Sequence, residues 1–544
     1  ITFFLTIFGT FMTRSGVVQS VHAFGEDPEL AMMFGIFMAI ILIVSFGLVI
    51  YRLPLLRARH ELDSWASREA AFLLNNWILL FCAVFILFAT MFPTLSEAIT
   101  GERLTVGPPF FNKWMLPIGL MLLLLTGVGP LLAWRKSTLS NLGNQFLWPI
   151  TVACITGGIL YALGFRVWSS GVCFMLCGFV LGTIGQEFIR GTRVRQEATG
   201  TDVLTSVTGL VARSHRRYGG YIIHVGIVLM FLGFAGEGYK LEEQVLLSPG
   251  QQVEVGRFVV RHEEVSVRDD GQKQMITGHL RVFEEGEEIG MMYPARWFFR
   301  KHEQEPTTEV AIHRTISEDL YIVMAAFDMQ DESASFQVTV NPLVNWIWFG
   351  FSIMALGTII ALLPEQAFSF AASKMPVGAA TTSLLLLVLA ASAPLHAQHV
   401  ESAQTVPTVP RSATERELYH EIVCMCGTCG RKLIGECTCG TAAMMRDEVS
   451  LLVDQGKTKE DVFQHFITMY GSQEPLAMPL DEGFNRLAWL FPYLLGLSGV
   501  VGVGTVALRW SMREAVDTPL PAGISNDGDV QLLARLDDEL RDLD

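Results

Sequence analysis

The feature that most constrains this chain is a series of apolar segments, each long enough to cross a lipid bilayer. A membrane-spanning helix needs roughly 20 mainly apolar residues. Eight segments meet that length: Ala31–Tyr51, Ala70–Phe92, Met115–Trp134, Phe146–Phe165, Trp168–Gln186, Tyr221–Glu237, Leu343–Leu363 and Phe484–Leu508. Because a backbone in lipid must satisfy its own hydrogen bonds, single apolar spans of this length are helices. The sequence therefore predicts an α-helical polytopic membrane protein.

The composition agrees with membrane lipid as the surroundings of the chain. Only 17% of the 544 residues are charged and the mean hydropathy is +0.39, whereas soluble domains carry about 25% charged residues. This excludes an ordinary soluble enzyme and a disordered protein. The net charge of -15 argues against a polyanionic partner, so no nucleic acid is expected.

The short basic loops predict how the chain is oriented in its membrane. Arginine and lysine gather in Arg52–Arg68, at Trp134–Lys136 and in Arg190–Arg217. Loops rich in these residues remain on the cytoplasmic side. This places two polar regions, 93–112 and 237–341, outside the cytoplasm.

The region 237–342 between two spans has the pattern of a small β domain. Its runs Gln252–Val260, Gly278–Phe283 and Glu309–His313 alternate apolar and polar residues, as half-buried strands do. The Asp-Asp-Gly sequence at 269–271 is typical of a hairpin turn. We expect an inserted extracytoplasmic β domain here.

A signal-peptide-like segment lies in the middle of the chain. Lys374 and Met375 precede an apolar core, and small residues follow up to Ala397. Two interpretations are open: residue 375 begins a second protein joined to the first, or the segment 375–397 is retained as a span. Proline and threonine then indicate a linker over 398–412.

Five of the nine cysteines fall between Cys424 and Cys439. Cys426 and Cys429 form a C-x-x-C motif, in which one thiol attacks a disulfide and the other resolves the intermediate. A zinc site is the alternative, with Cys424, Cys426 or Cys429 joining Cys437 and Cys439 as ligands, and structural disulfides are a third. The remaining cysteines, Cys82, Cys154, Cys173 and Cys177, lie in spans, where we expect packing roles.

The cysteines open a predicted helical domain. Ala442–Leu452 and Lys459–Tyr470 read as two short helices joined at Gly456. The predicted order is then a membrane region over 1–236, the β domain over 237–342, a span over 343–365, the signal-like segment over 375–397, the linker over 398–412, the helical thiol domain over 413–482, a span over 484–509 and an acidic cytoplasmic tail over 510–544.

Two of the twelve histidines stand out from the rest, which lie mostly in loops. His224 lies inside an apolar span, where an ionisable residue is a functional candidate and a neutral imidazole can ligate haem iron. A hydrogen bond to a neighbouring helix is the alternative. His22 lies where the first apolar segment, Ile1–Met12, leads out of the membrane.

Several long motifs resemble CcmF, the haem lyase subunit of bacterial system I cytochrome c maturation. Covering roughly 1–365, they are GTFMTRSGVVQSVHAF (9–24), REAAFLLNN (68–76), GPPFFN (107–112), SEDLY (317–321) and NPLVNWIW (341–348). Residues from about 414 to 510 resemble CcmH, the thiol reductase of the same pathway, through EIVCMCGTC (421–429) and GKTKEDVFQHFITMYG (456–471).

The CcmF resemblance implies a bacterial cytoplasmic (inner) membrane location, with the β domain and the C-x-x-C domain on the periplasmic side, and it implies specific roles. His22 matches a ligand of haem delivered by the chaperone CcmE, and His224 matches a ligand of a resident haem b. The family's partner histidines and tryptophan-rich motif are expected upstream of Ile1, so we expect this sequence to be a piece of a longer protein. The CcmH resemblance makes Cys426 and Cys429 the redox pair, although Cys424, Cys437 and Cys439 depart from the commoner pattern.

Together the two resemblances imply part of a haem lyase complex that supports haem attachment to apocytochrome c CxxCH motifs, with other maturation subunits as partners. A fused thiol–disulfide oxidoreductase module is expected to keep the apocytochrome cysteines reduced. The alternative from another class is a zinc-binding structural module on a transporter-like permease scaffold. A transporter predicts inverted internal repeats, and no obvious repeat is present in the sequence.

Overall fold

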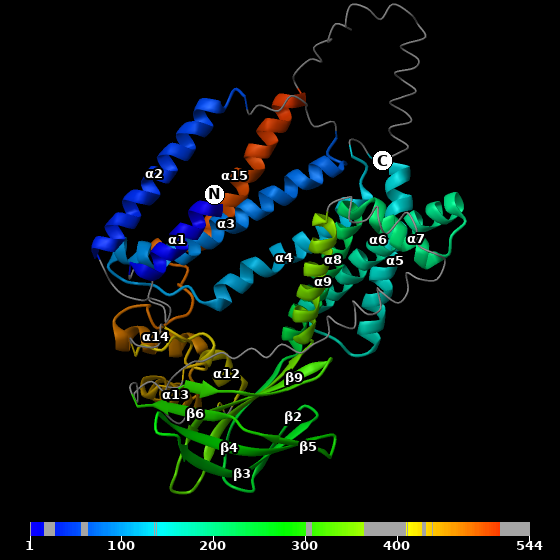
Figure 1. The fold of residues 1–544 in the computed structure, drawn as a ribbon. Coiled ribbons are helices and arrows are strands. Elements are labelled where there is room, and N and C mark those ends of the chain that lie inside the picture. Colours follow the sequence, from blue (N-terminus) through cyan, green and yellow to red (C-terminus); the bar gives the residue numbers. More distant parts are fainter. Residues whose placement is uncertain are drawn as a thin grey trace, which may run out of the picture.

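A computed structural model describes residues 2–15, 28–55, 64–134, 137, 139–300, 307–363, 410, 412–426, 431–437 and 439–511. Long helices form the upper part of the molecule, and a β domain and a small helical domain lie together at its lower end (Figure 1). His22, Cys429, the signal-like segment 375–397, most of the linker and the acidic tail lie outside the described residues.

Seven of the described helices are long and apolar enough to cross a membrane, and each contains most of a predicted span. The helices of this part are α1 (Thr2–Arg14), α2 (Pro28–Arg52), α3 (Arg68–Thr100), α4 (Pro108–Leu131), α5 (Leu139–Ala162), α6 (Trp168–Thr199), α7 (Val203–Arg213), α8 (His215–Ala235) and α9 (Asn345–Leu362). The seven are α2 to α6, α8 and α9. The predicted fold class, a polytopic helical membrane protein with an inserted β domain and a C-terminal helical domain, is confirmed.

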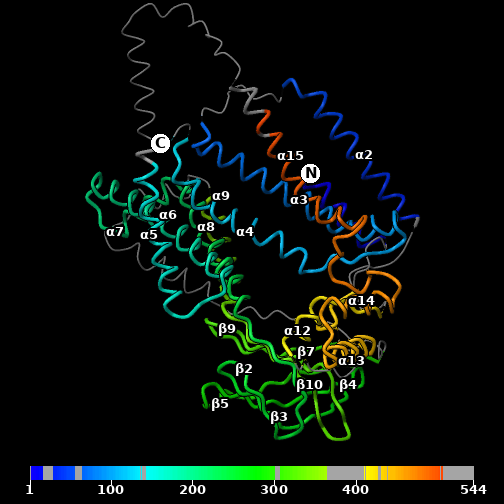
Figure 2. The backbone as a smooth tube through the Cα atoms, turned by 180° about the vertical axis from the view of Figure 1, so that it is seen from behind, coloured from blue at the N-terminus to red at the C-terminus, as the bar shows by residue number. Residues whose placement is uncertain are grey.

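The eighth predicted span lies in α15 (Arg486–Ser511), which follows the short turn η2 (Gly483–Asn485). This helix runs beside α3 in both views (Figures 1 and 2). The rings of Phe88 and Phe491 stack with their centroids 3.6 Å apart. The C-terminal part of the chain is therefore packed directly on the first half of the membrane region.

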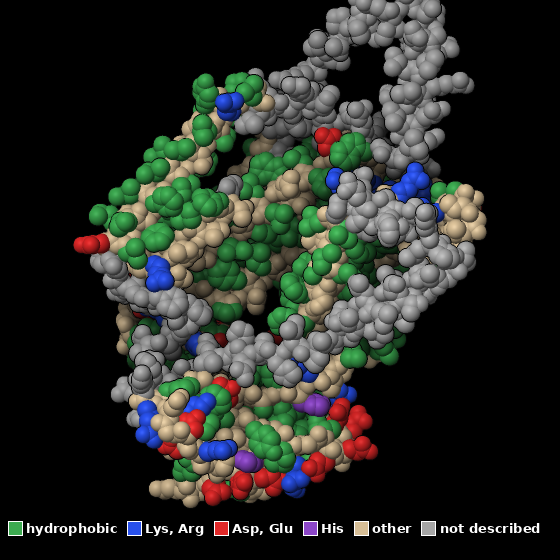
Figure 3. Space-filling view, viewed as in Figure 1, with side chains coloured by type: hydrophobic (Ala, Val, Ile, Leu, Met, Phe, Trp, Pro, Cys, Tyr) green, Lys and Arg blue, Asp and Glu red, His purple; other side chains and the backbone are tan. Residues whose placement is uncertain are grey.

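The start of α3 and the end of α4 lie together at one end of this helix pair. The loop that joins α3 to α4 lies at the other end, next to the polar domains. At one end, Arg68 donates its backbone N–H to Ala133 O (2.8 Å) and its side chain to Pro130 O (3.1 Å). At the other end, the α3–α4 loop contacts the small helical domain through Gly107, whose N–H donates to Ala477 O (2.8 Å). Charged side chains crowd the lower domains, and apolar side chains cover the helices above them (Figure 3).

Glycines allow α8 and α9 to pack at close backbone distance. A Cβ at Gly226 would lie 2.6 Å from both Gly350 O and Met354 N, and one at Gly357 would lie 2.7 Å from Ile223 N. Small residues at such a crossing let two membrane helices approach closely. This packing joins α9, which follows the β domain, to α8, which precedes it.

The β domain consists of two antiparallel sheets. In the described residues their strand orders are β1-β10-β9-β8 and β2-β3-β4-β6-β7, with β5 paired to β4. The strands are β1 (Leu241–Leu247), β2 (Gln252–Val255), β3 (Phe258–Asp269), β4 (Lys273–Glu284), β5 (Glu287–Met292), β6 (Ala295–Phe299), β7 (Thr307–Glu309), β8 (Ala311–Arg314), β9 (Glu318–Phe327) and β10 (Ala334–Pro342). Val260 and Leu280 from one sheet meet Ile322 and Val338 from the other in a common core.

Two strand predictions were wrong in their extent. The run Gln252–Val260 is broken into β2 and β3, because Gly256 takes a positive φ of 63° that turns the chain. The run Glu309–His313 is divided between β7 and β8, which belong to different sheets. Alternation alone carries no information on such a break. The turn at 269–271 is present, with Asp269 Oδ1 accepting from the N–H of Gly271 (2.7 Å).

The small helical domain contains α12 (Ala413–Tyr419), α13 (Gly440–Asp454) and α14 (Lys459–Tyr470). A capping box starts α14: Thr458 and Asp461 each accept the other's backbone N–H. Gly456, with φ of 73°, lies between α13 and α14. Buried residues of all three helices form one core, which includes Cys424 and Cys437.

Candidate functional site: a cysteine centre beside the membrane helices

Short backbone pairings position the first two cysteines. Val423 forms a β-bridge with Leu433. The N–H of Cys424 donates to Lys432 O (2.7 Å), and that of Ile434 to Ile422 O (2.9 Å). The segments on either side of the cysteine motif are thus held together by main-chain hydrogen bonds.

We call Cys424 and Cys426 the first cysteine arm, and Cys437 and Cys439 the second. The second cysteine arm is held by a turn and by the start of α13. The N–H of Cys437 donates to Leu433 O (2.9 Å). Cys439 is the N-cap of α13, and its Sγ accepts from the N–H of Ala442 (3.4 Å). Burial of this thiol works against ionisation, but the bond from Ala442 and the contacts with neighbouring thiols lower the pKa of Cys439.

Four thiols converge where these two arms meet. The Sγ atoms of Cys424, Cys426, Cys437 and Cys439 all lie within 4.8 Å of one another. Cys439 Sγ is 3.3 Å from Cys424 Sγ and 3.5 Å from Cys437 Sγ. Cys424 and Cys437 are buried, whereas Cys426 and Cys439 are half-buried. The structure therefore brings together four of the five cysteines considered as zinc ligands, and the fifth, Cys429, lies outside the described residues.

Arg446 was missed by the sequence reasoning. Its side chain is only 1% exposed, and its Nη1 donates to the main-chain oxygens of Ile434 and of Cys437, the latter at 2.6 Å. Burial lowers the pKa of the Arg446 guanidinium. The available signal was its spacing: it lies on the apolar face of α13 with Ala442 and Val449. The cation sits against the backbone of the second cysteine arm.

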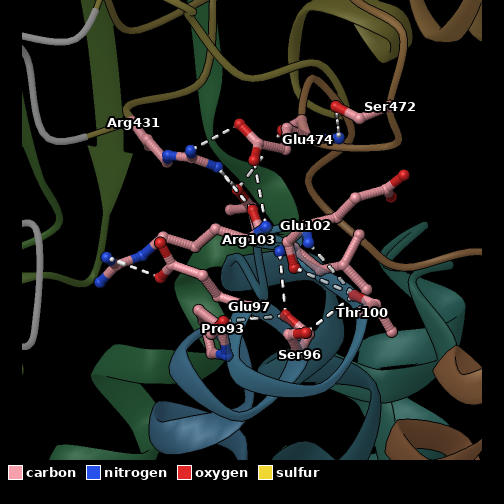
Figure 4. A network of polar contacts seen from close by, with 11 residues as sticks. Pro93, Ser96, Glu97, Thr100, Glu102, Arg103, Arg431, Ser472 and Glu474 are labelled. Atoms are coloured by element: carbon pink, nitrogen blue, oxygen red, sulfur yellow. Dashed lines mark hydrogen bonds and ion pairs between the residues drawn. The ribbon is translucent and has the colours of Figure 1, made fainter.

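A polar network docks this domain on the loop between α3 and α4 (Figure 4). Arg431 Nη2 pairs with Glu474 Oε2 (2.7 Å), and its Nη1 donates to Arg103 O (2.8 Å). Glu474 Oε1 accepts the N–H of Arg103 (3.0 Å). Arg431 follows Cys429 by two residues, so the network attaches the cysteine motif to the membrane region.

The domain also touches the β domain. Gln244 on β1 donates to Gly435 O (3.2 Å), and Arg416 on α12 lies 3.5 Å from Glu243. The two polar domains are adjacent when the molecule is seen from behind (Figure 2). The cysteine centre is therefore next to both the β domain and the ends of two membrane helices.

His224 lies on α8, inside one of the candidate spans. It is half-buried, and its Nδ1 is buried without a hydrogen-bond partner among the described residues. At 3.6 residues per turn it is about 140° around the helix from Gly219, which packs on α9. The expected alternative, a histidine bonded to a neighbouring helix, is not seen in the described part of the chain.

A second polar group in the membrane region was also missed. Glu187 of α6 is 6% exposed, and its Oε2 accepts from Arg217 Nη2 (2.7 Å) and from the Tyr221 hydroxyl (3.2 Å). A lone carboxylate after an apolar run of α6 was the available signal. Glu187 thus joins α6 to α8, and its partner Tyr221 lies about one helical turn before His224.

Three of the four cysteines in the spans pack as expected, and one does not. Cys82, Cys173 and Cys177 are buried, and Cys177 Sγ donates to Val228 O at 3.7 Å. Cys154 is exposed on the surface of α5. Its predicted packing role was wrong, because hydropathy does not show which face of an apolar helix is turned outward.

Two family comparisons match the two parts of the chain that the structure separates, the β domain and the C-terminal part with the cysteines. Residues 238–342 match the family described as "CcmF C-terminal beta-sandwich", and residues 384–534 match the CcmH family, described as "Cytochrome C biogenesis protein". The first match coincides with the β domain. The second contains all five clustered cysteines.

The chain is similar to bacterial proteins over its first two-thirds. It is 31% identical to "Cytochrome c-type biogenesis protein CcmF" of Pseudomonas aeruginosa over 368 residues, covering 67% of this chain and 54% of the relative. It is also 31% identical to "Cytochrome c-type biogenesis protein CycK" of Rhizobium meliloti, covering 66% and 53%. The chain thus spans about half the length of these relatives.

A solved structure, "Cytochrome c Heme Lyase CcmF", shares the fold. Its TM-score is 0.51 at 24% identity, with 66% of this chain and 53% of that one covered. The bacterial relatives and the seven apolar helices together indicate a multi-pass inner-membrane protein.

Proposed function

Since this chain belongs to the CcmF family of cytochrome c-type biogenesis proteins and continues into a CcmH-type domain, we propose that it supports haem attachment to apocytochrome c and keeps the substrate cysteines reduced. The observation that carries this proposal is the docking of the small helical domain that holds the clustered cysteines, called the cysteine domain below. Arg431 ties the C-x-x-C segment to the loop between α3 and α4, so thiol chemistry and the membrane region share one face.

The proposed thiol step uses Cys426 and Cys429. One thiolate attacks a disulfide of the apocytochrome or of a partner, and the second thiol resolves the mixed disulfide. The target gains two electrons and two protons and leaves as a dithiol, while Cys426 and Cys429 become a disulfide. A further dithiol partner must then reduce this pair. The positive-inside pattern and the position of the domain support a periplasmic site for this exchange.

The proposed haem ligand is His224. Its buried Nδ1, which has no hydrogen-bond partner among the described residues, fits a neutral imidazole, and its apolar surroundings suit a bound porphyrin. A haem ligated there would supply one-electron redox chemistry. His224 would hold the iron, and α8 and α9 would fix the imidazole through their glycine-mediated packing. His22 remains the proposed ligand for haem received from CcmE, with other maturation subunits as further partners.

The cysteine centre has metal binding as a second candidate role. The observation that favours it is the convergence of four Sγ atoms within 4.8 Å, which is the donor set of a zinc or iron–sulfur site. A transporter-like scaffold as the alternative has no support from the comparisons, which join the membrane region to cytochrome c biogenesis proteins.

The redox role is tested with Cys429→Ser in the natural host, grown without added reductant. We expect holocytochrome c to fall strongly and to recover when a small-molecule dithiol is supplied, because the dithiol replaces the missing electron donor. Cys154→Ser, a cysteine exposed on α5, is the matched control and is expected to have no effect. An unchanged yield in Cys429→Ser would contradict the redox role.

A further inference from the structure

We infer that Cys424, Cys426, Cys437 and Cys439 bind one zinc ion as a tetrathiolate site, and that zinc at this site and a disulfide between Cys426 and Cys429 exclude each other. The zinc site stands on the described geometry alone. The mutual exclusion rests in addition on the proposed thiol function.

The thiol positions fit the geometry of zinc. Zinc bound to four cysteines is tetrahedral with Zn–S of about 2.3 Å, which places neighbouring sulfurs about 3.8 Å apart. Here Cys439 Sγ is 3.3 Å from Cys424 Sγ and 3.5 Å from Cys437 Sγ, and all four sulfurs lie within 4.8 Å. These two distances are a few tenths of an ångström shorter than the spacing in a zinc tetrahedron, and no pair of the four sulfurs exceeds that spacing by more than about 1 Å.

The backbone brings the ligands together without the metal. The two arms are C-x-C pairs, 424–426 and 437–439, with ten residues between them. The bonds from Cys424 N to Lys432 O and from Cys437 N to Leu433 O fix one residue of each pair. Cys439 is fixed as the N-cap of α13. A preformed set of four thiols is a closed site, as structural zinc sites are.

The charge around the cluster also suits zinc. Zinc with four thiolates has a net charge of -2, and a buried charge of this size needs a counterion. The buried guanidinium of Arg446 donates to Cys437 O, so one positive charge lies beside the second arm. Its Nε and Nη2 have no hydrogen-bond partner among the described residues and remain available for sulfur.

A pair of disulfides fits the arrangement less well. A disulfide joins cysteines two by two, and its sulfurs are about 2.05 Å apart. In this cluster Cys439 Sγ lies at nearly the same distance from the sulfurs of Cys424 and Cys437 and also interacts with Cys426. Convergence of several thiols on one point is the arrangement that a single metal ion requires.

Cys426 links the zinc site to the proposed thiol exchange. When Cys426 and Cys429 pass two electrons to a partner disulfide, the sulfur of Cys426 enters a new S–S bond and leaves the zinc. Three thiolates remain, and the ion is released because a disulfide sulfur is a poor zinc ligand. Zinc would thus hold Cys426 as a protected thiolate until a disulfide substrate displaces it.

The site is tested by metal analysis of the complete chain, purified in detergent under reducing conditions with zinc in the growth medium. We expect about one zinc per chain for the wild type and Cys429→Ser, and a loss of about tenfold or more in Cys437→Ser and Cys439→Ser. A wild type without zinc, or Cys437→Ser and Cys439→Ser with full occupancy, would overturn the site.

Cobalt substitution of the wild type provides a test that does not depend on variant folding. Thiolate-to-cobalt charge transfer together with tetrahedral d–d bands supports the site, and octahedral cobalt absorption overturns it. Alkylation with peptide mapping that finds Cys424 or Cys437 in a disulfide in the freshly isolated protein also overturns it.

Mutual exclusion is tested by alkylating zinc-loaded and zinc-stripped protein and quantifying each cysteine by mass spectrometry. Zinc is expected to slow the labelling of Cys426 by about tenfold and to leave Cys429 unchanged. Equal labelling of Cys426 in both forms would refute the exclusion. Failure of the proposed redox function has a different signature: normal holocytochrome c in Cys429→Ser, with zinc content unaffected.

Discussion

Arg431 and Glu474 form an ion pair, Nη2 to Oε2 at 2.7 Å, that joins the cysteine motif to the end of the cysteine domain. Both residues also bond to Arg103 of the α3–α4 loop, Arg431 to its carbonyl oxygen and Glu474 to its N–H. The side chains of the pair are 20% and 23% exposed, so solvent screens it only in part. The ion pair therefore connects the cysteine centre to the membrane region through the α3–α4 loop.

Removing the guanidinium should loosen the docking. We expect Arg431→Ala to weaken the contact by about 1–3 kcal/mol, because charge-assisted hydrogen bonds at a partly buried site are lost. Hydrogen–deuterium exchange of the peptide containing Arg103 and Gly107 measures this, since both N–H groups donate to the cysteine domain. Exchange there should become faster. Arg416→Ala, which removes a more exposed ion pair to Glu243, should leave this peptide unchanged.

The close approach of α8 and α9 makes a paired prediction. Gly226→Ala places a Cβ 2.6 Å from Gly350 O and should destabilise the membrane region by about 1–3 kcal/mol through overpacking. Gly220→Ala meets nothing within 4 Å and should be neutral or slightly stabilising, because alanine favours the helix. Thermal unfolding in detergent separates the two. Equal melting temperatures would show that α8 and α9 are not packed in this way.

His224→Ala is predicted to remove a b-type haem signal. The buried Nδ1 without a described partner is the reason, since an imidazole in an apolar span needs either a bond or a metal. Reduced-minus-oxidised spectra of the protein purified from its natural host measure the haem. His279→Ala, a histidine on β4 bonded to Ser266, is the control. An unaltered b-type spectrum in His224→Ala would remove this ligand assignment.

Asp319, at the junction of β9 with α9, predicts a pH dependence. Burial raises the pKa of the Asp319 carboxyl, although the hydrogen bond from Asn345 and nearby positive charge oppose this. The folded chain therefore binds this proton more tightly than the unfolded chain, and the carboxyl lowers stability as the pH rises from about 3.9 through its folded pKa. The melting temperature of Asp319→Asn relative to wild type should therefore rise as the pH increases from about 3.9 to the folded pKa of Asp319. Above that pH the difference should stay constant.

Asp269→Asn supplies the opposite sign for comparison. The N–H of Gly271 and the guanidinium of Arg300 lower the pKa of Asp269. Its stabilisation is present above the ordinary aspartate pKa and is lost as the pH falls through the folded value. This variant should melt below wild type at neutral pH, and the gap should close on acidification. Two variants with the same pH profile would contradict the assignment at Asp319.

Much of the fold could be predicted because it depends on local properties of the chain. Lengths of apolar sequence located seven membrane helices, and Gly456 located the turn between α13 and α14. The break at Gly256 was missed because alternation does not reveal a positive φ that turns the chain, and the break before Ala311 was missed because a strand's partner is set by distant residues. The exposure of Cys154 was missed because hydropathy does not show which face of an apolar helix is turned outward.

For the candidate site, too, the features encoded in consecutive residues could be predicted, and those that depend on contacts between distant segments could not. The sequence by itself determined the membrane-spanning class, the cysteine motif and the resemblance to two cytochrome c maturation families, because hydropathy and motif spacing are written in consecutive residues. Only the tertiary structure decided that Cys426 meets Cys437 and Cys439, that Arg446 is buried beside them and that Arg431 reaches Arg103. These contacts follow from hydrogen bonding and burial between segments up to 328 residues apart, which no local pattern encodes.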